Sequence, residues 1–276
     1  MAKKEELIKE KVHADDPGPD KPIARLRWIM ETLRTPNGGC PWDLKQTHHT
    51  LRPYLMEEAC EVLDAIEDED DEELCKELGD LLLQIVFHSQ IASERGSFTL
   101  DDAARRISDK LLLRHPHVFG DKKVSSAEEV LQNWESIKLQ KEKKKHILEG
   151  VPRSLPALLV AYRIQEKVSS VGFDWKSPKE VVPKIHEEVD EFIKAYEEED
   201  FKKCEEEFGD LLFSLVNLAR LAGFNAEFGL KTTNDKFRKR FTRMEELIIA
   251  DGKRVDSLGL AELDAYWDKV KAEQVD

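Results

Sequence analysis

The sequence predicts an all-α protein made of two copies of one helical unit. Apolar residues recur at helical spacing, as in Ile185, Val189 and Phe192. Convincing β-branched alternation and an Asn-Gly hairpin signal between apolar runs are both missing. The duplication shows in CKELGDLL at residues 75–82 and EEEFGDLL at 205–212. Glycine inside a helix costs ~1 kcal/mol relative to alanine, so its presence at the same place in both stretches indicates a shared requirement.

The two copies align at a constant offset of 130 residues, the separation of Leu51 and Val181. The matched pairs are Pro53 with Pro183, Glu57 and Glu58 with Glu187 and Glu188, Glu61 with Glu191, and Glu77, Gly79 and Asp80 with Glu207, Gly209 and Asp210. After a short indel the offset becomes 126, which pairs Lys110 with Lys236 and Arg114 with Arg240. Further along, Trp134-Glu135 resembles Trp267-Asp268. The chain is a tandem duplication.

The boundary between the copies is expected near Gly150, where a lysine block runs into glycine and two prolines. We therefore predict a first domain over residues 21–150 and a second over 151–276. Residues 1–20 are charged, end in DDPGPD and are expected to form a disordered tail.

Three helices are predicted in the second copy. The first has Pro183 in its first turn, where proline is tolerated, and continues to about Glu199. The second covers residues 201–221 and the third covers 234–249. Each copy is therefore expected to be a small helical bundle.

Composition excludes several classes of protein. The 276-residue chain is 36 % charged, with a net charge of −14 and a pI near 5.2, which argues against a nucleic-acid binder and against docking on anionic membrane. The first residues lack an apolar leader, and the longest apolar run, 81–87, is too short to span a bilayer. A cytoplasmic protein is expected. Without Cys-x-x-Cys spacing, zinc and disulfide frameworks are disfavoured, and Cys60, Cys75 and Cys204 are expected in the core.

Acidic residues follow the edge of the apolar face on consecutive helices. At 100° per residue, Glu188 and Glu191 share one edge of their helix, and Glu207 and Asp210 share the same edge of the next. The first copy repeats this pattern. Packing the apolar stripes together would gather four like charges at one seam, unless these carboxylates are merely solvated. Hard divalent cations relieve such repulsion, and Gly209 would let the helices approach closely.

A basic stripe follows on the third helix. Lys236, Arg240 and Arg243 lie beside Phe237 and Phe241. This stripe is either an ordinary basic face or, next to a cation site, a clamp for phosphate groups. A P-loop is excluded, because its glycine-rich signature is missing.

These motifs resemble the MazG family of all-α nucleoside triphosphate pyrophosphohydrolases over about residues 21–276. The family pattern is Glu-Glu-x-x-Glu, then Glu-x-x-Asp on the next helix, then a Lys/Arg-bearing helix. Here it reads EEACE with ELGD in the first copy and EEVDE with EFGD in the second. The third element is DKLLLRHPHVF in the first copy and NDKFRKRF in the second. GCPWD at residues 39–43 and GVPRSLPALL at 150–159 also fit.

The resemblance implies Mg²⁺-dependent cleavage of a ribo- or deoxyribonucleoside triphosphate between the α and β phosphates, with Mn²⁺ as a substitute cation. It also implies a homodimer that completes the helical bundles; a regulatory protein partner is left open. The implied metal ligands are Glu188, Glu191, Glu207 and Asp210, matched by Glu58, Glu61, Glu77 and Asp80. Glu188 or Glu191 would also act on the attacking water. The implied nucleotide contacts are Lys184, Lys203, Lys236, Arg240 and Trp267, with Lys110 and Arg114 in the first copy.

The copies differ where phosphate would bind. Tyr54 stands in place of Lys184 and Glu73 in place of Lys203, so the second copy is expected to be the principal site. A protein that senses nucleotides without useful turnover remains the alternative, because binding and catalysis need the same carboxylates. A di-iron bundle is disfavoured: it needs paired Glu-x-x-His motifs, and the only one here, from Glu10 to His13, lies in the tail.

Overall fold

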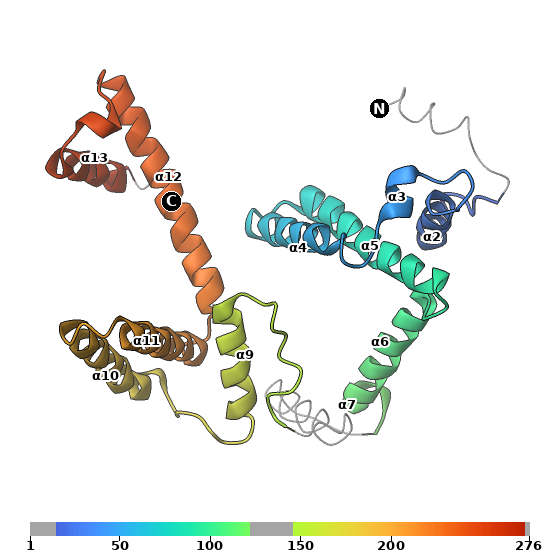
Figure 1. Cartoon of the computed structure of the whole chain (residues 1–276), viewed down its shortest axis with the longest axis horizontal. Coiled ribbons are helices and arrows are strands. Elements are labelled where there is room, and N and C mark those ends of the chain that lie inside the picture. The colour runs from blue at the N-terminus through green and yellow to red at the C-terminus, as the bar shows by residue number, and fades with distance from the viewer. Residues whose placement is uncertain (1–14, 122–145, 274–276) are drawn as a thin grey trace. The chain divides into compact units, whose positions relative to one another are not determined.

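The computed structural model describes residues 15–121 and 146–273, and every regular element within them is helical (Figure 1). The all-α prediction is confirmed. The chain divides into a first unit, residues 1–123, and a second unit, 124–276, and each is described by itself. The Glu10–His13 motif and Trp134-Glu135 lie outside the described residues. The division predicted at Gly150 stays a prediction.

The first unit is organised around a helical hairpin. Its helices are α2 (Pro22–Leu33), α3 (Pro41–Lys45), α4 (Arg52–Glu67), α5 (Asp71–Glu94), α6 (Leu100–Arg114) and α7 (Pro116–Phe119). Helices α4 and α5 pack along each other. The turn between them places Glu69 at φ 54°, and the side chain of Asp70 caps α5 by accepting from the backbone N–H groups of Glu72 and Glu73.

The core of the first unit lies between α2 and α5. Its buried apolar residues are Met30, Leu51, Val86, Phe87 and Ile91. Arg34 is buried beside this core, donates to both carboxylate oxygens of Glu94 at 2.7 Å, and also donates to the carbonyl oxygens of Asp43 and Gln46. The guanidinium therefore connects α2, α3 and α5. Within the predicted tail, Asp16 accepts from Arg25 at 3.1 Å.

The second unit repeats the hairpin. Its helices are α9 (Ala157–Ser169), α10 (Pro178–Glu197), α11 (Phe201–Leu221), α12 (Ala226–Ala250) and α13 (Leu260–Ala272), with a short 3₁₀ turn at Val255–Ser257. Helices α10 and α11 pack along each other. The turn places Glu199 at φ 57°, and Asp200 caps α11 through Lys203 N–H. Glu199 and Asp200 match Glu69 and Asp70 at the offset of 130, so the duplication extends to the backbone of the turn.

The predicted starts of two helices were wrong, and the predicted bounds of a third helix were confirmed. Helix α11 has the predicted bounds. Helix α10 begins at Pro178, so Pro183 lies inside it and removes one backbone donor. Helix α12 begins at Ala226, eight residues earlier than predicted, because Asn225 caps it by accepting from the N–H of Glu227.

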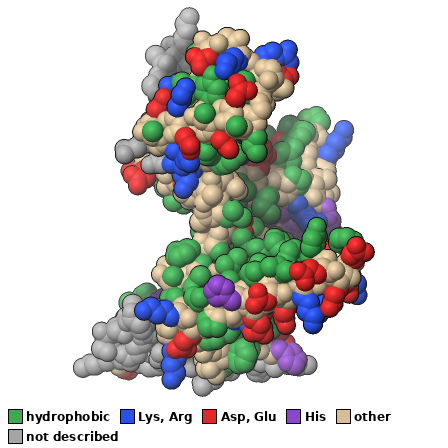
Figure 2. All heavy atoms as spheres, turned by 90° about the vertical axis from the view of Figure 1, so that its left-hand side faces the viewer, with side chains coloured by type: hydrophobic (Ala, Val, Ile, Leu, Met, Phe, Trp, Pro, Cys, Tyr) green, Lys and Arg blue, Asp and Glu red, His purple; other side chains and the backbone are tan. Residues whose placement is uncertain are grey.

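Part of each predicted apolar face is exposed rather than packed within the hairpin. Tyr196 is 62 % exposed and Phe208 is 49 % exposed, and hydrophobic side chains gather on the α10–α11 hairpin in Figure 2. The expected close approach at Gly209 was wrong: a Cβ added there, or at Gly79, would meet nothing within 4 Å among the described residues. Of the cysteines expected in the core, Cys204 is buried, whereas Cys60 and Cys75 are exposed.

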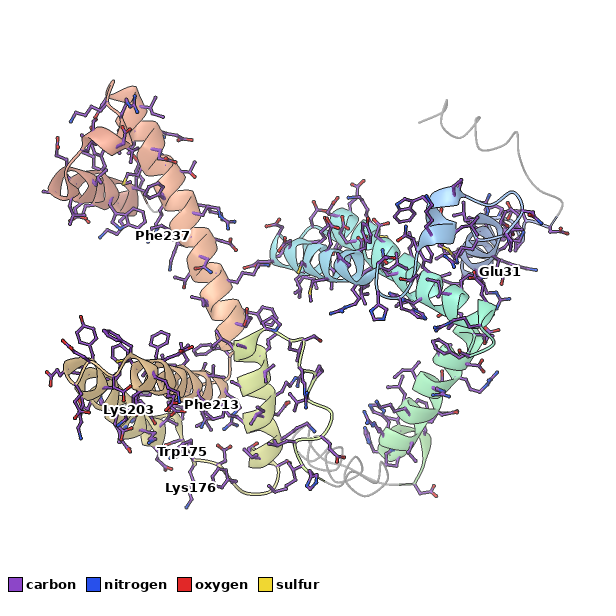
Figure 3. The ribbon with its side chains drawn as sticks, in the orientation of Figure 1. Glu31, Trp175, Lys176, Lys203, Phe213 and Phe237 are labelled. Carbon is purple, nitrogen blue, oxygen red and sulfur yellow. The ribbon has the colours of Figure 1, made fainter. Side chains whose placement is uncertain are left out.

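Helix α12 leaves the hairpin and packs against α13. Their shared core consists of Met244, Ile248, Tyr266 and Val270. Figure 3 shows Phe237 on α12, well away from Lys203 on the hairpin. No helix in the described ranges is both long and apolar enough to cross a membrane.

Candidate metal centres

The hairpin turn determines which carboxylates face each other in the second unit. Glu188 and Asp210 each lie eleven positions from Glu199, on opposite arms, and Glu191 and Glu207 each lie eight positions from it. In an antiparallel pair of helices, residues equidistant from the turn lie at the same height. The Glu-x-x-Glu and Glu-x-x-Asp spacings therefore place acidic residues across the hairpin from one another.

Three of these side chains form a compact cluster. Glu188, Glu207 and Asp210 each offer a carboxylate oxygen, and the three oxygens lie within 4.8 Å of one another. We call them the second cluster. Glu188 is only 3 % exposed, because it points into the α10–α11 interface. Burial raises the pKa of Glu207, and the nearby charges of Glu191, Glu188 and Asp210 raise it further. Oxygen donors under mutual repulsion fit a hard divalent cation.

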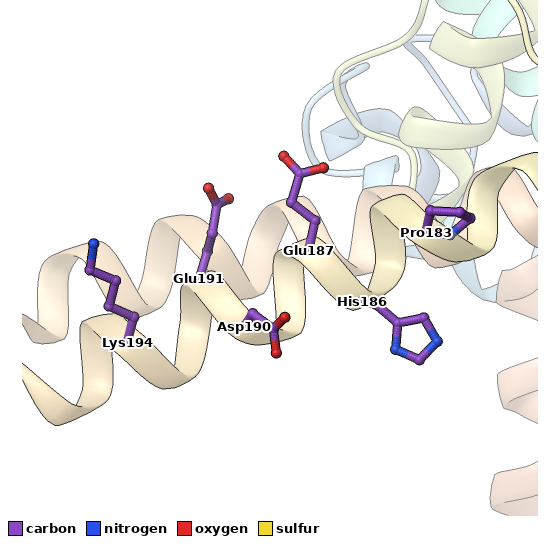
Figure 4. Close-up of a pocket in the computed structure, with 6 residues that line it drawn as sticks. All are labelled: Pro183, His186, Glu187, Asp190, Glu191 and Lys194. Carbon is purple, nitrogen blue, oxygen red and sulfur yellow. The ribbon is translucent and has the colours of Figure 1, made fainter.

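Glu191 lies outside this compact group, but its charge acts on a member of the group. Figure 4 shows its carboxylate directed to the same side of α10 as that of Glu187, whereas His186 and Asp190 point elsewhere. It lines a shallow surface pocket with Pro183, His186, Glu187, Asp190 and Lys194. Its charge is the strongest carboxylate influence on Glu207. Glu191 therefore stands at the solvent-facing edge of the second cluster.

Two of the predicted nucleotide contacts lie beside the second cluster. Lys184 Nζ is 2.8 Å from Glu188 Oε1 and 2.9 Å from Glu187 Oε1. Lys203 Nζ is 3.8 Å from Glu207 Oε1. Each lysine stands one helical turn before its acidic partner, on the same face. The ion pairs raise the pKa of Lys184, so it carries a full positive charge at the edge of the cluster.

The first unit contains the matching cluster, formed by Glu58, Glu77 and Asp80 with carboxylate oxygens within 4.8 Å. We call these the first cluster. Glu77 is 5 % exposed. Glu61 lies outside the group, as Glu191 does, and burial followed by the charges of Glu77 and Glu58 raises its pKa.

Two residues that the sequence patterns did not single out contact the first cluster. Lys76 Nζ lies 2.8 Å from Glu77 Oε1 and 2.6 Å from Glu73 Oε1. The hydrogen bond from Lys76 lowers the pKa of Glu77, whereas the pKa of its counterpart Glu207 is raised. Gln84 Nε2 donates to Glu58 Oε1 at 3.4 Å. The only sequence signal for Lys76 was its spacing from two glutamates, and there was none for Gln84.

The structure does not bring the remaining predicted contacts to the clusters. Lys236 and Arg240 lie on α12, and Phe237 beside them is far from Lys203 in Figure 3. Trp267 on α13 packs on Phe237, with ring centroids 5.1 Å apart. Lys110 and Arg114 lie on α6, which follows the end of α5 remote from the α4–α5 turn (Figure 1).

Comparison with known proteins shows that both hairpins lie in segments that match one known domain. Residues 46–119 and 176–244 each match the MazG nucleotide pyrophosphohydrolase domain. The chain is 46 % identical over 259 residues to the nucleoside triphosphate pyrophosphohydrolase of Escherichia coli K12, covering 92 % of this chain and 98 % of that protein. It is 49 % identical over 245 residues to the nucleoside triphosphate pyrophosphohydrolase/pyrophosphatase MazG of Thermotoga maritima, covering 88 % and 93 %. A nucleoside triphosphate pyrophosphohydrolase of Mycolicibacterium smegmatis is 36 % identical over 177 residues, covering 62 % and 52 %.

Proposed function

The chain belongs to the family of MazG nucleotide pyrophosphohydrolases, and from this premise we propose that it hydrolyses nucleoside triphosphates to nucleoside monophosphate and pyrophosphate. The bond cleaved is the anhydride between the α and β phosphates. Ribo- and deoxyribonucleoside triphosphates are both candidate substrates. The observation that carries the proposal is the second cluster, where Glu188, Glu207 and Asp210 present converging oxygens beside Lys184.

The donor set supports Mg²⁺, with Mn²⁺ as a substitute. Carboxylate oxygens are the ligands that both cations prefer, and neither sulfur nor imidazole belongs to the group. Glu188, Glu207 and Asp210 would hold the cation, with Glu191 completing the set from the edge. When bound, the cation would offset phosphate charge and acidify a water molecule.

The protein's own groups would then bind and orient the substrate. Lys184 and Lys203 balance carboxylate charge, and both ammonium groups would turn to phosphate oxygens once a cation takes their place. Glu191 is exposed and next to the cluster. Its carboxylate, or that of Glu188, would accept a proton from the attacking water.

Lys236, Arg240 and Trp267 would contact the nucleotide from α12 and α13. Because these helices stand apart from the hairpin, we propose that a second copy of the chain or a closure of α12 brings such groups to the cluster. The exposed apolar side chains of the hairpin (Figure 2) support a homodimer in which hairpins pair to complete a bundle.

The test is the product formed from a nucleoside triphosphate. Incubation with Mg²⁺ is expected to release pyrophosphate and nucleoside monophosphate in equal amounts, measured by chromatography and a pyrophosphate-specific assay. Release of orthophosphate with nucleoside diphosphate would overturn the site of cleavage. Saturable nucleotide binding with no product under Mg²⁺ or Mn²⁺ would instead identify a nucleotide sensor.

A further inference from the structure

A buried polar stripe runs along α5 of the first unit, beyond the first cluster. Among the described residues, three buried side-chain atoms lack a hydrogen-bond partner, and two of them are Gln84 Oε1 and His88 Nε2. Gln84 is only 6 % exposed. The two residues are four positions apart and therefore share one face of the helix. Leaving both atoms unsatisfied costs free energy, so two such atoms on one helix face require an explanation.

Hydrogen-bond donors and acceptors identify His88 Nε2 as a donor. Arg95 Nη2 lies 2.8 Å from His48 Nε2, and arginine can only donate. His48 Nε2 therefore accepts, and the proton of that ring is on Nδ1. His48 Nδ1 lies 2.8 Å from His88 Nδ1, with the two ring planes only 9° apart. His48 thus donates to His88, whose own proton is on Nε2.

The same reasoning identifies Gln84 Oε1 as an acceptor. The Gln84 side chain meets Glu58 Oε1 at 3.4 Å, and an ionised carboxylate can only accept, so the amide nitrogen must face it. The amide oxygen then faces away from Glu58. Helical side chains lean toward the N-terminus of their helix, which directs the ring of His88 over the turn that carries Gln84. A buried donor and a buried acceptor therefore lie on the same face of α5, one helical turn apart.

We propose that Gln84 and His88 are positioning residues for Glu58 in the first cluster. One bridging water accepts from His88 Nε2 and donates to Gln84 Oε1, as buried waters do between polar groups. The resulting chain extends from Arg95 through His48, His88 and Gln84 to Glu58. It holds one oxygen of Glu58 in place for a divalent cation. This last consequence rests on the proposed function, in which the carboxylate clusters hold such a cation.

The second unit does not repeat this chain. At the offset of 130, Ser214 matches Gln84 and Leu218 matches His88. Ser214 and Leu218 cannot make the same connection, because leucine has no polar side-chain atom and serine is too short to replace the amide. Gln84→Ser and His88→Leu therefore install residues already compatible with the same helix and hairpin.

The hydrogen-bonded chain is tested without any metal, through thermal unfolding of the full-length protein in chelator. The single variants Gln84→Ser and His88→Leu are compared with the double variant. If the two residues share one chain, the double variant loses no more Tm than the more damaging single variant. Additive losses overturn the proposal. His88→Gln, which keeps an N–H donor, is expected to restore the coupling.

The effect on the cluster is tested with Mn²⁺ alone, in protein that also carries Asp210→Ala so that the second cluster is disabled. Electron paramagnetic resonance measures free Mn²⁺. Gln84→Ser and His88→Leu are each expected to weaken Mn²⁺ binding on the order of 10-fold, as changes behind metal ligands do. The controls Gln90→Ser and His49→Leu are expected to leave it unchanged. Unchanged affinity in the test variants overturns the positioning role. Coupled unfolding with no Mn²⁺ bound by the Asp210→Ala parent would instead overturn the proposed cation site and leave the chain standing.

Discussion

At the residue scale, two matched glutamates have opposite electrostatic environments. Glu77 and Glu207 occupy equivalent positions, yet the bond from Lys76 lowers the pKa of Glu77, whereas burial and neighbouring carboxylates raise that of Glu207. The lysine of the first unit approaches to 2.8 Å and that of the second stays at 3.8 Å. The second cluster is also bordered by Lys184, 2.8 Å from Glu188 Oε1, so Lys184 and Lys203 are both placed to meet phosphate there, whereas Lys76 of the first cluster is bound to Glu73 and Glu77.

This difference predicts unequal effects of alanine substitutions. Glu188→Ala or Asp210→Ala is expected to abolish most pyrophosphate release, because each removes an oxygen of the second cluster. Glu58→Ala or Asp80→Ala is expected to cost much less. Steady-state rates at saturating substrate check this, with circular dichroism to confirm folding. Equal losses, or a larger loss from the first pair, would move the principal site to the first unit.

The histidine pair predicts a pH-dependent stability. Burial lowers the pKa of both His48 and His88, and Arg95 lowers that of His48 further. With folded pKa values below the unfolded value of about 6.5, the unfolded chain binds more protons as the pH falls. Stability is therefore full above about pH 6.5 and declines as the pH drops through that value toward the folded pKa values.

The measurement is the urea midpoint of the full chain between pH 8 and pH 5.5. His88→Leu is expected to reduce the dependence on pH, because that group no longer titrates. His186→Leu serves as the control, since His186 is exposed and does not influence the pKa of His48 or His88. A midpoint that changes with pH equally in wild type and His88→Leu would contradict this account.

At the scale of elements, the hairpin explains the acidic spacing but not the glycines. Pairing about Glu69 and Glu199 aligns the carboxylates, whereas Gly79 and Gly209 face open space. Nothing in the described residues explains why glycine stands at these two positions. Each glycine therefore lowers the stability of its helix, and no contact among the described residues offsets that loss.

Gly209→Ala consequently has a predicted sign. In helix α11 the substitution should stabilise the protein by ~1 kcal/mol, because alanine is the better helix former and meets no neighbour. Thermal unfolding checks this, with Gly79→Ala as the matched variant. A lower Tm accompanied by a smaller oligomer would show that a second copy approaches the helix at Gly209.

At the scale of the whole molecule, the main feature is apolar surface that is exposed to solvent. Tyr196 and Phe208 are exposed on the second hairpin, and Leu63 and Leu78 are exposed on the first. Exposed apolar area of this kind is typical of interaction surfaces. The hairpins therefore resemble halves of bundles rather than finished ones.

A homodimer is the expected outcome in solution. Sedimentation velocity at micromolar concentration should give a dimer, and Phe208→Asp should shift it toward monomer by placing a charge on the apolar face. An exposed substitution away from the hairpin, Asp256→Asn, should leave the mass unchanged. A monodisperse wild-type monomer would contradict the pairing of hairpins.

The sequence by itself determined the helical class, the duplication and the acidic clusters. These features depend on local spacing: the three-residue separation within each motif and the symmetric distances from Glu69 and Glu199 already place Glu58 with Asp80 and Glu188 with Asp210. Such distances are set by helical geometry, whatever the rest of the chain does. The bounds of α11 followed from the same periodicity.

Only the tertiary structure decided how each helix is rotated about its axis and which long side chains meet. Rotation buries Glu188, leaves Phe208 exposed, and turns Gly209 to open space. The side-chain rotamers of Lys76 and Glu77 determine that these two residues form an ion pair. The direction of α12 after the turn at residues 222–225 carries this helix away from the α10–α11 hairpin (Figure 1). These outcomes balance packing among several elements at once, and a periodic pattern in one helix does not encode that balance.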